Sequence, residues 1–307
     1  PPRSTLFPYT TLFRSKNGIE KYYNSYLQGV AGERHIKVNA HNVEIEELDR
    51  TPTQGNHNLV LNIDMRLQNY IGQLFDKKVG TIIVMDVHGA VYAAGSYPEY
   101  DLNSFVSGIS STEWNALMNS VDAPFTNKLI SGLYPPGSTI KTGLGLIYIT
   151  SGVMDEYSTI FSTGSMRLGN RTFRDWKKTG HGVTNVSKAI TESCDDYFYQ
   201  GALQVGIDRM STGLIRMGLG KKTGIDLPNE FIGTVPSRAW KRAKFHKPWY
   251  QGETLNTSIG QGDFLITPFQ MARFTALMAT GYLPIPHVAK MIGDNPYTPV
   301  PLDVLTP

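Results

Sequence analysis

The sequence has 307 residues, which is enough for one large domain or two ordinary domains with a substantial core. Its net charge of +3 is distributed over residues of both signs, so the composition argues against nucleic acid as a partner. No apolar run reaches the roughly 18 residues of a transmembrane helix. Cys194 is the only cysteine, which excludes an internal disulfide.

The first part of the chain divides into two segments. Residues 1–15 (PPRSTLFPYTTLFRS) resemble a translated sequencing-adapter read, or else a disordered native segment, and we exclude them from fold reasoning. Residues 16–57 form a small unit of their own. Alternating side chains at 35–39 and 43–46 predict short strands there, and the Pro, Gly and polar residues of 51–56 indicate a linker.

A larger domain is predicted over residues 58–307. Its first elements are a strand at 59–63, a helix at 65–75, and a hairpin of strands 80–85 and 90–94 whose turn requires a positive φ at Gly89. From Ser138 to about Met278 the pattern predicts a helical region.

Residues 134–141 (YPPGSTIK) place Ser138 and Lys141 three positions apart. Pro135, Pro136 and Gly137 are unsuited to a helix interior, so Ser138 is expected in the first helical turn, where free N–H groups favour negative charge. Side chains three apart lie about 5–6 Å from each other at Cβ, so a partly buried Lys141 is within reach of the Ser138 hydroxyl as its base. The alternative is a capping serine followed by a solvated lysine.

Ser193 and Asp195 form a second element, about 55 residues downstream. Penicillin-recognising serine enzymes pair an S-x-x-K element with an S-x-N or S-x-D element on the opposite wall of a cleft. Ser193 alone is better explained as a helix cap. The two elements together favour a catalytic site over either structural explanation.

Further segments extend this similarity along the chain, and together with residues 134–141 the sequence resembles the penicillin-binding protein 2 family, the elongation-specific peptidoglycan transpeptidases. The segments are 16–23 (KNGIEKYY), 173–178 (FRDWKK), 181–182 (HG), 224–228 (GIDLP), 247–252 (KPWYQG) and 260–262 (GQG). The resemblance implies an α+β fold of the penicillin-binding, serine β-lactamase-like type. Residues 16–57 then correspond to the end of a non-catalytic pedestal, or dimerisation, domain.

The resemblance also implies a mechanism. Ser138 attacks the carbonyl of a D-Ala-D-Ala stem peptide, Lys141 accepts its proton, Ser193 passes a proton to the departing D-Ala, and Asp195 positions the substrate amide. An amine from a neighbouring strand then resolves the acyl-enzyme. No cofactor is required for this chemistry. The two alternatives are a β-lactam-sensing receptor domain and a serine β-lactamase.

The family's third motif, K-S-G or K-T-G on a strand of the cleft, is expected well after residues 260–262 and does not occur there. Lys222-Thr223-Gly224 matches its letters but precedes that segment, so we interpret it as a coincidental match. The chain is therefore expected to be truncated before the last sheet strands. Because the missing strand carries one oxyanion-hole donor, usually worth about 10²–10³ in rate, the fragment is expected to be inactive.

The implied partners are peptidoglycan stem peptides on lipid II-derived strands, β-lactams, a RodA-type glycan polymerase and an MreC-type scaffold, with no nucleic acid. The implied location is the periplasmic side of the cytoplasmic membrane, with the anchor outside this chain.

Some family members hold a structural zinc, and three of its four ligand positions correspond to Asp175, His181 and Cys194. Ser162 stands at the fourth, and serine is a poor zinc ligand. The site is then completed by water or another carboxylate such as Asp155, or is lost. The alternative is a buried thiol beside a hydrogen-bonded histidine. The large rings of Trp176 and Trp249 are interpreted as packing residues rather than as substrate contacts.

Overall fold

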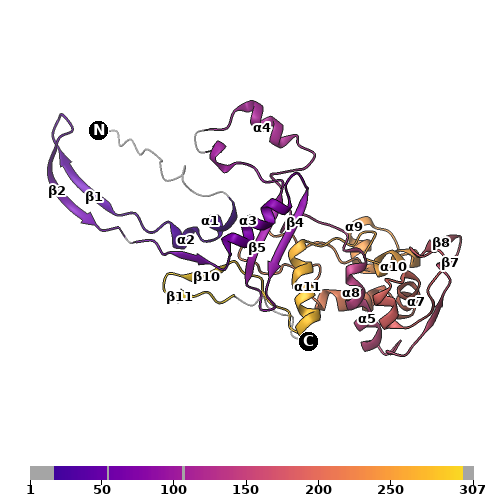
Figure 1. Cartoon of the computed structure of the whole chain (residues 1–307). Helices are drawn as coiled ribbons and strands as arrows, with labels where there is room; N and C mark the ends of the chain where they lie inside the picture. Colours follow the sequence, from indigo (N-terminus) through magenta and orange to yellow (C-terminus); the bar gives the residue numbers. More distant parts are fainter. Residues whose placement is uncertain (1–16, 54, 106–107, 300–307) are drawn as a thin grey trace.

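The computed structural model describes residues 17–53, 55–105 and 108–299 (Figure 1). Residues 1–15, which the sequence analysis set apart, lie outside the described residues. The described chain forms an N-terminal ribbon, a central layer of strands and helices, and a mainly helical part that carries the candidate site.

The N-terminal unit contains two short helices and a two-stranded antiparallel ribbon that extends away from the rest of the molecule (Figure 1). Every residue of the ribbon is exposed. The strands expected at 35–39 and 43–46 are both present, within a longer pairing. The elements are α1 (Gly18–Tyr22), α2 (Asn24–Leu27), β1 (Glu33–Val38) and β2 (Glu44–Thr51).

A buried contact joins this unit to the large domain. Tyr23, which is 1% exposed, donates a hydrogen bond of 2.6 Å to the carboxylate of Asp226. The same carboxylate accepts the N–H groups of Val288 at 2.7 Å and Ala289 at 2.8 Å. Three segments that are far apart in sequence therefore meet at one fully buried aspartate.

The central layer contains the predicted strand, helix and hairpin. Asp64 caps its helix by accepting hydrogen bonds from the N–H groups of Arg66 and Leu67. In the hairpin, Gly89 has a φ of +102°, and a Cβ there would lie 2.3 Å from the Ile285 carbonyl oxygen, so the glycine is required. The elements are β3 (Leu59–Leu61), α3 (Met65–Leu74), β4 (Gly80–Met85) and β5 (Val91–Tyr97).

One strand pairing was not predicted. β3 is antiparallel to β10 (Ala289–Ile292), which pairs in turn with β11 (Asn295–Pro296). This three-stranded sheet places residues near the start of the domain beside residues near position 290. Between the hairpin and the helical part lie a 3₁₀ helix, η2 (Leu102–Phe105), and α4 (Ser111–Met118).

The helical part is built around one core. Its largest fully buried side chains include Leu144, Tyr148, Phe198 and Phe274, and burial of each such side chain contributes about 1.5–3 kcal/mol. The helices are α5 (Lys141–Thr150), α6 (Val186–Thr191), α7 (Asp195–Val205), α8 (Ile207–Arg216), α9 (Arg238–Phe245), α10 (Gln251–Ser258) and α11 (Pro268–Thr280).

The region predicted as helical from Ser138 to about Met278 contains strands between α5 and α6, which the sequence analysis did not predict. Four short strands form two antiparallel ribbons there, one of β6 with β9 and one of β7 with β8. Strands of three or four residues are too short to show a clear alternation, which explains the error. The strands are β6 (Ile160–Ser162), β7 (Ser165–Leu168), β8 (Arg171–Arg174) and β9 (Gly182–Thr184).

Candidate active site and metal centre

The candidate nucleophile lies on a tight turn before α5. Ser138 is exposed and lies in a 3₁₀ helix, η3 (Gly137–Ile140). The first turn was expected to be α-helical and to exclude Gly137, whereas it is a 3₁₀ turn that includes this glycine. The N–H of Gly137 donates to the carbonyl of Gly260 at 2.9 Å. A Cβ on Gly260 would lie 2.1 Å from the Gly137 carbonyl oxygen, so the backbone of Gly260 packs directly against the turn that carries Ser138.

Lys141 is buried, at 2% exposure, and its ammonium group connects the two sequence elements. Its Nζ donates to the Ser193 carbonyl at 2.9 Å, to the Ser193 Oγ at 3.2 Å and to Asp195 Oδ1 at 2.5 Å. All three hydrogen bonds go to the 193–195 segment. The spacing placed the Lys141 amine within hydrogen-bonding distance of the Ser138 hydroxyl, but no such hydrogen bond is present among the described residues.

Ser193 and Asp195 sit at the junction of α6 and α7. Ser193 has a φ of +53°, a conformation uncommon for a residue with a side chain and one that often occurs at functional sites. Burial raises the pKa of the Asp195 carboxyl, and the ion pair with Lys141 opposes that shift. The structure thus engages Asp195 with the lysine, whereas the sequence analysis assigned it to a substrate amide.

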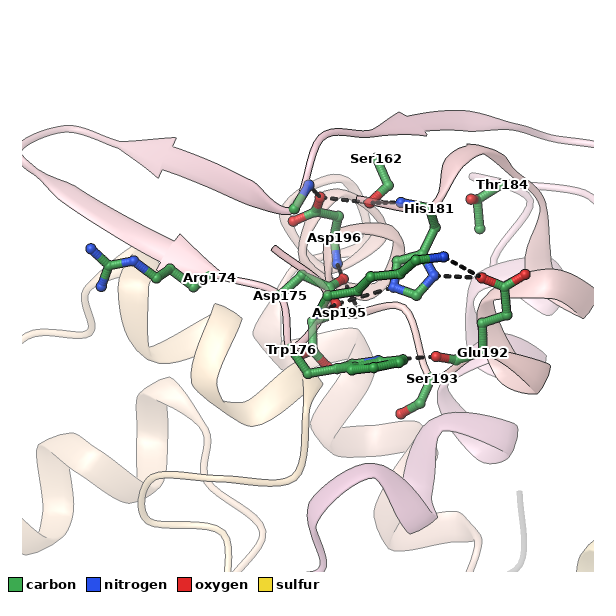
Figure 2. A network of polar contacts seen from close by, with 12 residues as sticks. Ser162, Arg174, Asp175, Trp176, His181, Thr184, Glu192, Ser193, Asp195 and Asp196 are labelled. Carbon is green, nitrogen blue, oxygen red and sulfur yellow. Dashed lines mark hydrogen bonds and ion pairs between the residues drawn. The ribbon is translucent and has the colours of Figure 1, made fainter. Parts of the chain in front are cut away.

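A pocket of about 410 Å³ brings these groups together. Its lining residues are Ser138, Trp176, Ser193, Asp195, Ile259 and Gln261. Trp176, interpreted as a packing residue, is not in the core, because its side chain is exposed. Its ring meets the His181 ring edge-on, and its Nε1 donates to the Glu192 carbonyl at 3.0 Å (Figure 2). Sequence reasoning did not place Ile259 or Gln261 at the site, although the 260–262 motif pointed to that segment.

The Lys222-Thr223-Gly224 tract does not line this pocket. Thr223 is fully buried, and its N–H and hydroxyl both donate to Glu230, at 2.8 Å and 2.6 Å. The tract is therefore a structural turn, in agreement with its interpretation as a coincidental match.

Behind the pocket, Asp175, His181 and Cys194 are buried together, with potential ligand atoms all within 4.8 Å of one another. The His181 Nε2 faces Asp175 Oδ1 at 3.1 Å, and its Nδ1 faces Glu192 Oε2 at 2.7 Å (Figure 2). A carboxylate on the second ring nitrogen is the usual support of a metal-binding histidine. Carboxylate, imidazole and thiol are also donors that suit zinc.

The remaining neighbours complete a polar network around these three residues. Burial raises the pKa of the Cys194 thiol to about 11, while hydrogen bonds from the Tyr197 backbone and the Ser162 side chain act in the opposite direction. Ser162 lies at the predicted fourth position, but its hydroxyl donates to Asp196 at 2.8 Å. The Asp175 Oδ2 accepts the N–H groups of Asp195 and Asp196, which links this centre directly to the start of α7.

Comparison with known proteins identifies the family to which the chain belongs. A family model of the penicillin binding protein transpeptidase domain matches residues 80–304, and a model of the penicillin-binding protein dimerisation domain matches residues 14–61. The chain therefore belongs to the penicillin-binding protein transpeptidase family. Its fold is the α+β fold of that family, as predicted.

Within this family the chain is similar to penicillin-binding protein 2. It is 40% identical over 284 residues to peptidoglycan D,D-transpeptidase MrdA of Escherichia coli K12, covering 91% of this chain and 45% of the relative. It superposes with a TM-score of 0.85 on a penicillin-binding protein 2 solved in complex with MreC from Helicobacter pylori, at 46% identity over 91% of this chain and 53% of that one. The superposition on penicillin-binding protein 2 of Pseudomonas aeruginosa has a TM-score of 0.82, at 37% identity, and covers 93% of this chain and 60% of that one. The chain thus spans about half the length of these relatives.

Proposed function

We propose that the chain supplies the acylating site of a peptidoglycan D,D-transpeptidase that cross-links stem peptides through a serine acyl-enzyme during cell elongation. The observation that supports this most is one pocket shared by Ser138, Ser193 and Asp195, with the buried Lys141 bonded to the last two. These are the groups that acyl transfer requires: a nucleophile, a base and a proton relay.

In this mechanism the Ser138 hydroxyl attacks the D-Ala-D-Ala carbonyl and gives its proton to Lys141. Ser193 lies 3.2 Å from the lysine Nζ and passes the proton to the departing D-Ala. Lys141 is held by Asp195 in this structure. To accept the serine proton it has to be the neutral amine, and its Nζ has to turn from Asp195 toward Ser138. General acid–base assistance of this kind contributes about 10²–10⁴-fold.

Two related structures support a proposal for the partners. One related structure holds penicillin-binding protein 2 with MreC, and another, at 31% identity, belongs to a peptidoglycan synthase complex that couples polymerisation and cross-linking. We propose an MreC-type scaffold, a RodA-type polymerase, stem peptides and β-lactams as partners, on the periplasmic side of the membrane. None of the helices in the described ranges is long and apolar enough to cross a membrane.

Loss of one oxyanion-hole donor slows acyl transfer by about 10²–10³ but leaves the Ser138 nucleophile in place. Prolonged incubation with benzylpenicillin is therefore expected to add the mass of one penicillin to the chain, even though transpeptidation by the fragment is not expected. Ser138→Ala is expected to remove the adduct. Intact-mass spectrometry checks this, with a circular-dichroism spectrum showing that the variant is folded. An adduct that persists for hours supports the transpeptidase class, whereas rapid hydrolysis supports the serine β-lactamase. An adduct in the Ser138→Ala variant, or none in the folded parent chain, contradicts the proposal.

We also propose that Asp175, His181 and Cys194 hold a structural zinc ion. The ion would fix the loop that precedes α7, on which Ser193 and Asp195 lie. Purified protein is expected to contain about one zinc per chain, and Cys194→Ala together with His181→Ala is expected to abolish it and lower the melting temperature. Elemental analysis well below one zinc, with a melt unaffected by a chelator, would exclude the site.

A further inference from the structure

A second hollow lies along α10, outside the pocket that contains Ser138. Its volume is about 830 Å³, and it shares Lys247, Trp249 and Gln251 with an adjoining hollow of about 560 Å³. Together they form a basic groove, defined here by Arg171, Arg242, Lys247, Trp249 and Tyr250. The proposed mechanism uses none of these residues.

The groove carries a surplus of positive charge. Lys241 at its floor is neutralised by an ion pair with Glu253, the only acidic residue among the described residues that line either hollow. Arg171, Arg242 and Lys247 are exposed, and none of them forms an ion pair with a described residue. Three unpaired cations in a concave surface attract and retain anionic groups.

Aromatic rings give the groove a fixed shape. Trp249 is anchored by a hydrogen bond of 2.9 Å from its Nε1 to Thr254 Oγ1, and the Lys241 ammonium lies 4.7 Å from the centre of the Tyr250 ring. Tyr250 is nevertheless 60% exposed, so a rigid apolar face remains open to a ligand. Trp249, interpreted as a packing residue, is partly exposed and lines both hollows.

The C-terminal end of α10 links the groove to the pocket that contains Ser138. Asn256 lines the groove, and its carbonyl accepts the N–H groups of Ile259 at 3.3 Å and Gln261 at 3.0 Å, both of which line the pocket. The eight residues of α10 span about 12 Å at 1.5 Å each. An extended peptide covers that distance with about four residues.

We propose that the basic groove is a subsite for the stem peptide. The groove binds the internal carboxylates of the peptide while the reacting carbonyl lies at Ser138. The inference rests on the proposed function and names the part of the substrate that the groove recognises. A neutral peptide of the same length would find no partner for the three cations. Penicillin, which is short, would leave the groove largely empty.

The test measures binding to the full 307-residue chain by calorimetry. The probes are a D-Ala-D-Ala pentapeptide with two internal carboxylates and the same peptide with both amidated. The double variant Arg171→Ala/Lys247→Ala is compared with Arg209→Ala/Lys290→Ala, which removes the same charge from exposed positions outside the groove. We expect the groove variant to bind the charged peptide at least about tenfold more weakly and the control to stay within about twofold.

Three outcomes overturn the inference: equal affinity of the parent chain for both peptides, equal losses in both variants, or stronger competition by inorganic diphosphate than by the dicarboxylate glutarate. The last would assign the groove to phosphate instead. Failure of the parent chain to form a penicillin adduct refutes the proposed acyl-enzyme but leaves the peptide affinities measurable. Thermal melts of all variants show that lost binding is not lost folding.

Discussion

Replacing Gly260 by alanine is expected to slow benzylpenicillin acylation by at least about 100-fold. The new Cβ would lie 2.1 Å from the Gly137 carbonyl oxygen and 2.5 Å from its nitrogen, so the backbone beside Ser138 has to move. The hydrogen bond from Gly137 N–H to the Gly260 carbonyl, 2.9 Å long, is lost in the same displacement. Misplacement of a reacting group by about 1 Å costs about 10²-fold in rate. Stopped-flow measurement of acylation checks the value.

Gly262→Ala is the matched control for this prediction. Gly262 has a φ of +75°, close to the +71° of Gly260, so both variants carry the same conformational cost of about 1–2 kcal/mol. A Cβ at Gly262, however, meets only the Asn256 Cβ at 3.4 Å. The control is therefore expected to lose stability but to keep acylation within a few-fold of the parent. Equal slowing in both variants would show that backbone strain, and not the contact with Gly137, determines the rate.

The sequence predicted which residues meet at the site better than it predicted how they bond. The S-x-x-K and S-x-D spacings identified Ser138, Lys141, Ser193 and Asp195, and the structure brings all four together. The direction of the Lys141 amine depended on a partly buried carboxylate 54 positions away, which helical spacing alone does not reveal. Spacing fixes which residues share a face, whereas the partner is chosen by tertiary packing.

The fold shows the same division between local and long-range information. The hairpin of β4 and β5 was predictable because its turn and its alternating strands are contiguous in sequence. The pairing of β3 with β10 joins residues more than 220 positions apart, at Leu61 and Ala289, and nothing local marks it.

Asp226→Ala is expected to lower the free energy of unfolding by about 3 kcal/mol. The substitution leaves the N–H groups of Val288 and Ala289 and the Tyr23 hydroxyl without an acceptor in a fully buried place. Each unsatisfied buried group costs about 1–3 kcal/mol, while removal of a buried carboxylate returns part of that loss. Denaturant titration measures the change, and Asp263→Ala, at an exposed position, is expected to stay within about 0.5 kcal/mol.

A double-mutant cycle with Tyr23→Phe separates the two roles of this aspartate. Burial, followed by the hydrogen bond to Asp226, raises the pKa of Tyr23 far above its usual range, so the phenol is a donor at every physiological pH. Tyr23→Phe alone is expected to cost about 1–2 kcal/mol, and to cost almost nothing once Asp226 is alanine. Additive losses would mean that the N-terminal unit is held by packing around Tyr23. A coupled loss means that one carboxylate fixes both β10 and the N-terminal unit, so the orientation of that unit depends on the 224–228 segment of the large domain.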